Sequence, residues 1–304
     1  MENQSSITAL ISLFGRAYHR ENDQPVLFDD PLSRQLMTEE EYRQIQQYML
    51  SGIDFFAPDK KDTFSSEKEM LQWIVQTQIS PTPLARARYC EDALDTAVFT
   101  GSRQYVILGA GMDTFAFRNP YGIPVFEVDH PMTQEEKRKR TARAGWKTPE
   151  TLHFVPVDFT KDRLSEYRLS KKLTENGYNP GKKAFFSWLG VSYYLTMDHI
   201  DDLLEEIASV AAEGTSLVFD YASEELFTSP VKRVQNMLAM AAAGGEPMKT
   251  GFRYEQLESL LEKHGFLIYE HLETEEIQER FFAERTDSLA AFEHIRYVHA
   301  VRKI

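Results

Sequence analysis

The sequence contains one cysteine among its 304 residues, so no disulfide can form within the chain. Nothing here demands an oxidising compartment. Long apolar runs are also missing. The most apolar stretch, AFFSWLGVSYYL at 184–195, is well below the roughly 20 residues that cross a bilayer. The first residues, MENQSSITALISLFGRAYH, lack the basic start of a signal peptide. We expect a soluble cytoplasmic protein with no membrane partner.

Positive charge is scarce. The chain has 34 Lys and Arg against 47 Asp and Glu, a net charge of −13. Such an acidic surface repels phosphate backbones, which argues against a nucleic-acid partner. The eight histidines are scattered, and His294 and His299 lack the spacing of metal ligands, so no metal site is predicted.

Strand patterns are missing from residues 1–100. ITALISLFGRAY, EEEYRQIQQYML and EKEMLQWIVQTQI carry apolar residues at helical spacing, with prolines between the segments. We predict that residues 1–100 form helices and loops, and that residues 101–304 form the domain that follows them.

Short apolar strands alternate with helical patterns from residue 104 onward. Strands are predicted within 104–111, 124–131, 151–159, 183–191, 215–222, 266–272 and 295–304, and helices within 133–144, 161–176, 198–214 and 254–264. This alternation predicts an α/β fold with a doubly wound, mostly parallel sheet, in which the last two strands form a pair at one edge. The long segment 223–253 is predicted to contain a helix and to act as a lid.

A glycine turn follows the first predicted strand, in YVILGAGMDT. Gly109 and Gly111 allow backbone to approach a ligand closely. Asp129 ends the second strand, where a carboxylate can accept hydrogen bonds from a ribose diol. An ordinary turn and a helix cap are the alternatives, but the combination favours a nucleotide-type cofactor.

Asp113, the acid beside the glycine turn, indicates which cofactor binds there. A dinucleotide would place its pyrophosphate on the next helix, where the carboxylate of Asp113 is unfavourable. The third glycine of the dinucleotide fingerprint is also absent, because Thr114 stands there. S-adenosylmethionine carries no phosphate and suits an acidic turn better. Asp158, after the third strand, can accept from its adenine amino group. Asp113 can equally cap the following helix.

Several motifs together resemble the leucine carboxyl methyltransferase family. They are VILGAGMDTFAFR, VFEVDHP, VPVDF, WLGVSYYLT, PLARARYCEDAL and DDPLSRQLM. The resemblance covers nearly the whole chain and is strongest at 82–222. The family includes protein phosphatase methyltransferases and bacterial polyketide O-methyltransferases. The resemblance implies a class I S-adenosylmethionine-dependent methyltransferase with a seven-stranded Rossmann-like sheet and a helical N-terminal cover.

The resemblance also implies the cofactor contacts. The glycine turn, Gly109, Ala110 and Gly111, lines the methionine part of the cofactor, and Asp129 holds the ribose. Asp158 and Phe159 frame the adenine. Arg86 pairs with the cofactor carboxylate. Arg88 is a possible substitute for the arginine, and Arg16 a second cation. A surface ion pair is the alternative for each.

Leu189 departs from the family pattern. An acid usually stands at this position after the fourth strand, so substrate identity cannot be transferred. Trp188, Tyr193 and Tyr194 follow the same strand and are candidates for the acceptor pocket, with core packing as the alternative. Arg253, on the predicted lid, can pair with an acidic acceptor or stay solvated.

Three functions follow from these patterns. The first is an O-methyltransferase acting on a carboxylate or hydroxyl of a small molecule. A carboxylate is already ionised, whereas a hydroxyl needs a general base. The second is an NAD(P)-dependent oxidoreductase, which Asp113 and the missing third glycine disfavour. The third is a non-catalytic cofactor-binding protein, which Leu189 leaves open.

Overall fold

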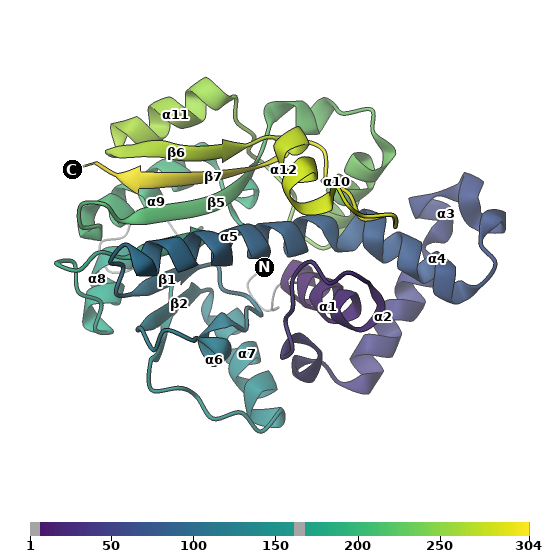
Figure 1. Ribbon diagram of the computed structural model, residues 1–304, viewed down its shortest axis with the longest axis horizontal. Coiled ribbons are helices and arrows are strands. Elements are labelled where there is room, and N and C mark those ends of the chain that lie inside the picture. Colours follow the sequence, from purple (N-terminus) through teal and green to yellow (C-terminus); the bar gives the residue numbers. More distant parts are fainter. Residues whose placement is uncertain (1–6, 161–167, 304) are drawn as a thin grey trace.

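A seven-stranded sheet forms the centre of the computed structural model, which describes residues 7–160 and 168–303 (Figure 1). The strand order is β3-β2-β1-β4-β5-β7-β6. The strands are β1 Tyr105–Leu108, β2 Val125–Asp129, β3 Leu152–Pro156, β4 Phe185–Trp188, β5 Ser216–Ala222, β6 Phe266–Leu272 and β7 Ile295–Arg302. Neighbours from β3 to β5 pair in parallel, and β7 is antiparallel to both β5 and β6. The predicted α/β fold and the terminal pair at one edge are confirmed.

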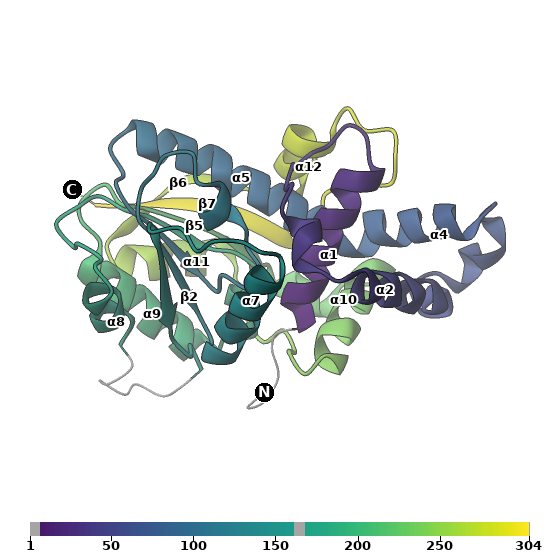
Figure 2. The ribbon, with the colours of Figure 1, turned by 90° about the horizontal axis from the view of Figure 1, so that it is seen from below.

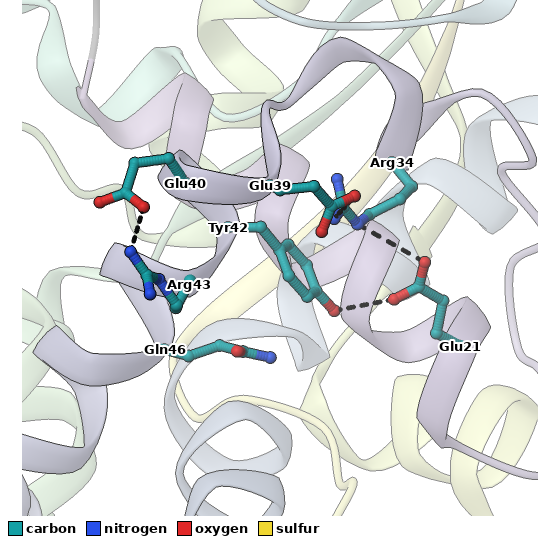
Figure 3. A pocket seen from close by; sticks show the side chains of 7 residues that line it. All are labelled: Glu21, Arg34, Glu39, Glu40, Tyr42, Arg43 and Gln46. Atoms are coloured by element: carbon teal, nitrogen blue, oxygen red, sulfur yellow. Dashed lines mark hydrogen bonds and ion pairs between the residues drawn. The ribbon is translucent and has the colours of Figure 1, made fainter.

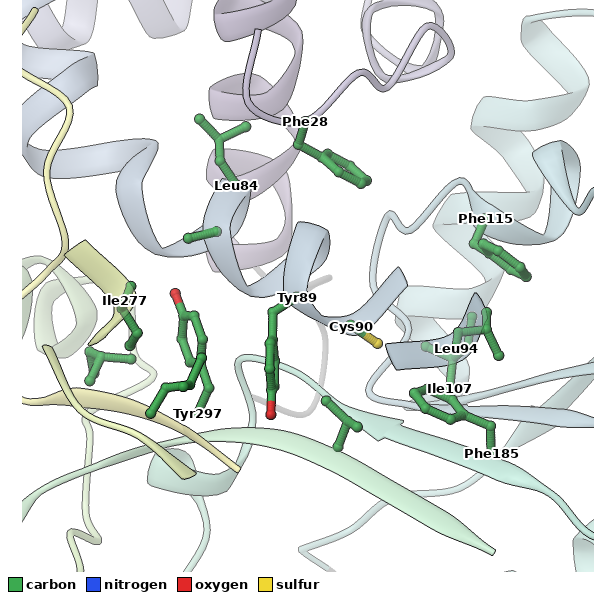
Figure 4. Close-up of a cluster of buried hydrophobic side chains, with 14 of the residues drawn as sticks. Phe28, Leu84, Tyr89, Cys90, Leu94, Ile107, Phe115, Phe185, Ile277 and Tyr297 are labelled. Atoms are coloured by element: carbon green, nitrogen blue, oxygen red, sulfur yellow. The ribbon is translucent and has the colours of Figure 1, made fainter. Parts of the chain in front are cut away.

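The central strands β1, β4 and β5 are buried along their whole length because both sheet faces are covered. In β1, Tyr105 and Ile107 face the core that contains α5 Pro81–Phe99, while Val106 and Leu108 face the opposite core. Figure 4 shows the α5 side, where Tyr89 points from α5 toward the sheet and Leu84 lies on the other side of the helix, near Phe28. The opposite core receives α8 Leu169–Glu175, α9 Met197–Val210 and α11 Tyr254–Lys263 (Figure 2).

Helices from the first hundred residues cover one end of the sheet (Figures 1 and 2). They are α1 Ile7–Asn22, α2 Glu39–Ser51, α3 Ile53–Phe56, α4 Glu67–Ile74 and the π-helical turn Val75–Ile79, with short 3₁₀ turns at Ser33–Leu36 and Pro58–Thr63. The following α5 lies along a face of the sheet instead. A separate core holds this cover together, and Met112 of the glycine turn belongs to it. The cover therefore packs directly on the turn after β1.

The segment 223–253 contains a helix, as predicted. It runs from Lys232 to Ala243 as α10 and packs on the cover, against α3 and the π-helical turn. The amide Nδ2 of Asn236 donates to the carbonyl of Phe56 at 3.1 Å.

Several elements differ from the sequence predictions. The long α5 was not predicted, because Pro81 and Pro83 looked like interruptions; they lie in its first turn, where no backbone N–H is needed. The helix α12 Thr274–Phe282 was also not predicted. The short α6 Phe115–Arg118 is the helix expected after the glycine turn, and α7 Pro131–Arg143 was predicted as well. The helix predicted at 198–214 ends at Val210. For the one predicted at 161–176, residues 161–167 lie outside the described part, and α8 covers 169–175.

Two features are absent from residues 7–160 and 168–303. No helix there combines the length and apolar character needed to cross a bilayer. No group of three or more His, Cys, Asp or Glu side chains there is placed to hold a metal ion.

A buried histidine predicts how stability depends on pH. The Nε2 of His299 on β7 lies 3.0 Å from the Ser216 hydroxyl, and burial lowers the pKa of His299 to about 4. Between pH 6.5 and 4 the unfolded chain protonates this group and the folded chain does not. Stability is therefore lost as pH falls through this window, by at most about 1.4 kcal/mol per pH unit. Urea unfolding from pH 7 to 4.5 should show a shallower acid limb for His299→Gln than for the wild type. Equally steep limbs would contradict this assignment.

Candidate active site

A cavity of 1190 Å³ opens at the carboxyl ends of the parallel strands. Its strand-end lining comprises residues 109–113 after β1, Asp129 and His130 after β2, residues 158–160 after β3, and Leu189, Gly190 and Val191 after β4. Helices α1, α2, α3, α5 and α10 supply most of the rest, together with Gln78 and Ile79 of the π-helical turn, Tyr193 and Tyr194 after β4, and Glu246, Pro247 and Lys249 after α10. This is the ligand position expected for a doubly wound sheet.

The glycine turn needs both of its glycines. Gly109 and Gly111 have φ values of 70° and 49°, in the left-handed region that favours glycine. A Cβ on Gly109 would also collide with the side chain of Val191. Backbone therefore faces the cavity here without side chains in the way.

Asp113 lies at the start of the helix that follows the glycine turn. Its Oδ1 accepts from the backbone N–H of Phe115 at 2.6 Å, the first residue of α6, so it satisfies one free amide at that end although Thr114 occupies the N-cap position. The same residue lines the cavity beside the glycine turn. A phosphate placed there would meet this carboxylate, which favours a cofactor without phosphate.

Asp129 is held by backbone amides at the end of β2. Its carboxylate accepts from the N–H groups of Gly111 and His130, one on each oxygen. Burial raises the pKa of Asp129 above its usual value, and the two amides oppose this rise. A carboxylate offers about four acceptor positions, so it can take two further donors from a ligand diol.

Asp158 and Phe159 line the same cavity after β3. The Oδ1 of Asp158 accepts from the Thr160 amide at 2.9 Å and its hydroxyl at 2.7 Å. Its Oδ2 lies 3.6 Å from Nε2 of His130. The structure therefore brings Asp129, Asp158 and Phe159 to one rim.

Arg86 projects from α5 into the cavity, where its side chain is 14% exposed. Its Nη1 donates to the hydroxyl of Tyr193 at 2.9 Å and to Oδ2 of Asp220 at 3.1 Å. The guanidinium lies against Gly190, where a Cβ would come within 2.5 Å of Nη2. Glycine at this position leaves room for the arginine.

The other two candidate arginines are placed differently. Arg88 is half exposed, pairs with Asp92 at 2.9 Å and does not line the cavity. Arg16 lines it but bonds to Asp30 at 3.0 Å and to the carbonyl of Met112 at 2.7 Å. Arg16 thus ties α1 to the glycine turn, and Arg86 is the better-placed partner for a ligand carboxylate.

Asp220 is a site residue that the sequence did not reveal. It lies on β5 with its side chain fully buried, and its Oδ1 accepts from the Gly190 amide at 2.6 Å. One carboxylate thereby holds Arg86 and the loop after β4, beside Leu189. Its signal in the sequence is a single acid within the apolar strand TSLVFDYA.

The acceptor-pocket candidates separate into two groups. Tyr193 and Tyr194 line the cavity, with ring centroids 4.8 Å apart, and burial raises the pKa of both phenols. Trp188 does not line it. Alternation along β4 turns this indole to the opposite sheet face, fully buried against Phe219. Arg253 does not line it either, because it is exposed and pairs with Glu224 at 3.0 Å. The pocket assignment is therefore dropped for both residues in favour of the alternatives, core packing for Trp188 and an exposed position for Arg253.

A second hollow, of 850 Å³, lies on the outer surface of the cover (Figure 3). Its charged side chains pair with one another. Arg34 lies 2.6 Å from Glu39 and 3.6 Å from Glu21, and Arg43 pairs with Glu40. These pairs compensate its charges internally, so we do not take it as the active site.

Comparisons with known proteins identify the family. The leucine carboxyl methyltransferase family model matches residues 9–208. The chain is 47% identical to YktD of Bacillus subtilis (strain 168), over 99% of both chains. YktD is assigned as an S-adenosyl-L-methionine-dependent methyltransferase. A Mycolicibacterium smegmatis protein assigned to the same class is 30% identical, over 70% of this chain and 65% of its own. The chain belongs to the leucine carboxyl methyltransferase family and is an S-adenosylmethionine-dependent methyltransferase.

Solved structures agree on the fold. A protein of Thermobifida fusca YX assigned as a methyltransferase superposes with a TM-score of 0.57 at 13% identity, covering 99% of this chain and 96% of that one. A DUF574 family protein of Streptomyces avermitilis gives 0.55 at 15% identity, covering 85% and 95%. At these identities the likeness shows the fold alone.

Proposed function

We propose that the protein methylates an oxygen atom of a small molecule, with a carboxylate preferred over a hydroxyl. The observation that carries this proposal is the continuity of the cavity. Its strand-end part, residues 109–113, 129–130 and 158–160, is the cofactor lobe. Its part between α1, α2, α3 and α10 is the acceptor lobe. The volume of 1190 Å³ exceeds the roughly 300–1,000 Å³ of an ordinary ligand site, which leaves space for cofactor and acceptor together.

The described residues fit S-adenosylmethionine. In this proposal Asp129 holds the ribose hydroxyls, and Asp158 and Phe159 frame the adenine. The backbone of residues 109–111 receives the methionine part, and Arg86 pairs with its carboxylate. The bound cofactor supplies a sulfonium methyl group as the electrophile, so the protein mainly has to align the acceptor with it.

The protonation states of the lining side chains favour an acceptor that arrives ionised. Burial raises the pKa of Tyr193 and Tyr194, which keeps both phenols protonated near neutral pH. His130, the histidine among the described lining residues, lies in the cofactor lobe beside Asp158. A carboxylate acceptor reacts without losing a proton, whereas a hydroxyl acceptor must lose one. These side chains therefore support a carboxylate as the acceptor over a hydroxyl.

The enclosure of the acceptor lobe supports a small molecule over a protein tail. Met237 and Met240 of α10 line it, and the hydroxyl of Thr8 in α1 donates to Glu246, just beyond α10, at 2.6 Å. We propose that residues 223–253 act as its lid, residues 1–100 as the cover and residues 101–304 as the methyltransferase domain of one structural unit.

Titration calorimetry with S-adenosylmethionine, S-adenosylhomocysteine and NADH tests the cofactor. We expect micromolar binding of the first two and none of NADH, because Asp113 disfavours a pyrophosphate. Binding of NADH alone would favour the oxidoreductase alternative, and no binding would favour a non-catalytic protein. A panel of acids and alcohols with methyl-labelled cofactor then tests the acceptor. A product that loses its label as methanol in base is a methyl ester, whereas a base-stable product is an ether.

A further inference from the structure

Two exposed aromatic side chains line the cavity where α2 meets α3. Tyr48 of α2 is 66% exposed, and Phe55 of α3 is 40% exposed. Phe99, Phe227 and Tyr269 are at least as exposed as Phe55, but none of them lines the cavity. Large apolar side chains scattered singly over a surface are ordinary, whereas a group of them beside a cavity is typical of a ligand-binding surface. We call the position of Tyr48 and Phe55 the α2–α3 corner, and the cavity opens to solvent there.

An apolar path leads from the α2–α3 corner into the acceptor lobe. The rings of Phe55 and Phe56 pack edge to face with centroids 5.3 Å apart, and Phe56 is only 3% exposed. On α2, Met49 follows Tyr48 and is 1% exposed. Phe56 and Met49 both line the cavity. On both helices the lining therefore continues from an exposed ring to a buried apolar side chain.

The walls of this part of the cavity carry no charge. None of the described residues that α2, α3, the π-helical turn and α10 contribute to the lining is charged, and Tyr48, Ser51 and Gln78 are its neutral polar members. The charged lining residues lie at the strand ends, on α1 and α5, and beyond α10. There the backbone N–H of Lys249 donates to the Tyr193 carbonyl at 2.6 Å, which holds this lysine beside the cofactor lobe. An ionised group of a ligand is therefore favoured near the cofactor lobe, and an apolar group toward the α2–α3 corner.

One continuous row of helical residues shows how long the acceptor lobe is. The π-helical turn continues into α5 through Ser80, which has helical φ and ψ. Residues at helical spacing along this row line the cavity: Gln78, Ile79, Thr82, Pro83, Arg86 and Ala87. The eight residues from Gln78 to Arg86 correspond to roughly 12 Å along a helix. Because α10 packs against both the π-helical turn and α3, the lobe extends from Arg86 at its inner end to the α2–α3 corner at its outer end.

We propose that the acceptor is a long-chain aliphatic carboxylate, whose chain runs along the acceptor lobe and leaves the protein across Tyr48 and Phe55. This assignment rests on the proposed function and names its substrate class. The carboxylate lies at the inner end, the middle of the chain contacts Met49 and Phe56, and the two exposed rings cover the distal methylenes. Both the chain and the rings thereby leave water, which is the source of the affinity.

Calorimetry with two chain lengths tests this assignment. The full-length protein is saturated with S-adenosylhomocysteine and then titrated with octanoate or dodecanoate, each below its micelle concentration. An extended octanoate ends inside a lobe of roughly 12 Å, whereas dodecanoate reaches the α2–α3 corner. Each methylene that is fully removed from water strengthens binding about fourfold. We expect the wild type to bind dodecanoate at least tenfold more tightly than octanoate, because the corner covers the additional methylenes only in part.

Matched double variants show whether the corner causes this preference. Tyr48→Ser/Phe55→Ser should lower the ratio between the two acids to threefold or less and leave the affinity for octanoate within twofold of the wild type. The control Tyr269→Ser/Phe227→Ser removes a tyrosine and a phenylalanine that are 74% and 40% exposed but lie outside the cavity lining, and it should keep the wild-type ratio. The single variant Tyr48→Ser, which leaves α3 unchanged, should show part of the same loss.

The readouts separate the possible failures. A wild type without the chain-length preference, or a corner variant that keeps it, overturns the assignment, and so does an equal loss in the control. Absence of S-adenosylhomocysteine binding in the wild type instead contradicts the proposed function. A wild-type dimer that the corner variant dissociates in sedimentation would make the corner an interface between copies and overturn the proposal. A fall in the urea midpoint of the corner variant that the control does not show would make the two rings structural, with the same consequence.

Discussion

Arg86→Ala is expected to weaken binding of S-adenosylhomocysteine by about a hundredfold, whereas Arg88→Ala should leave it unchanged. Truncating one partner of a buried, hydrogen-bonded charge pair typically costs about 2–5 kcal/mol of binding free energy. Arg86 faces the cavity, but Arg88 is half exposed and already pairs with Asp92. Calorimetry on the two variants compares neighbouring arginines of one helix. A larger effect at Arg88 would move the carboxylate site by two residues.

The same substitution should also lower the free energy of unfolding. Asp220 is fully buried and pairs with Arg86 at 3.1 Å, so Arg86→Ala leaves a buried carboxylate without its cation. Breaking a buried pair in this way costs on the order of 3–5 kcal/mol. Weaker binding by Arg86→Ala therefore has two explanations, a lost contact with the ligand carboxylate and a disordered loop after β4, and this variant by itself does not distinguish them.

A double variant separates the two effects. In Arg86→Met/Asp220→Asn both charges are gone, so stability measured by urea unfolding should recover in part. The amide oxygen of the new Asn can still accept from the Gly190 N–H, as Asp220 does now. Binding of S-adenosylhomocysteine should stay weak, because no cation remains for its carboxylate. Recovery of binding together with stability would mean that Arg86 acts only by supporting the loop.

The sequence predicted the sheet well because its strands are short, apolar and bounded by turns. Gly109 and Asp129 could be placed from sequence for the same reason, since carboxyl ends of parallel strands share one edge. It was harder to predict which side chains of β4 point to which face of the sheet. AFFSWLGV is apolar at nearly every position, so period-two alternation gives no signal and could not decide whether Trp188 lines the acceptor pocket or packs in the core.

The other features that the sequence did not reveal are contacts between segments far apart in the chain. Asp220 meets Arg86 across 134 residues, and no local pattern marks such a pair. The partner of Arg253, Glu224, likewise becomes visible only once residues 223–253 fold against β5. Tertiary packing decides these cases, so composition and spacing could not.

Asp129→Asn is expected to remove the preference of the protein for a ribose over a deoxyribose. In the wild type, S-adenosylhomocysteine should bind about 10- to 100-fold more tightly than its 2′-deoxy analogue, since a hydrogen bond to a charged group contributes about 1.5–3 kcal/mol. Asp129→Ala should likewise weaken S-adenosylmethionine binding by at least about 1 kcal/mol. Unchanged affinity in calorimetry would contradict the ribose assignment.

Asp158→Asn is the matched control, because it changes a second acid on the same rim without touching the ribose partner. It should weaken both ligands and keep the ratio between them. The pH dependence gives an independent check. Burial raises the pKa of Asp129, and only the ionised carboxylate accepts from both hydroxyls. The ribose preference of the wild type should therefore decline as pH is lowered and Asp129 becomes protonated, and Asp129→Asn should show no such decline. A preference that persists unchanged in Asp129→Asn would place the ribose elsewhere on the rim.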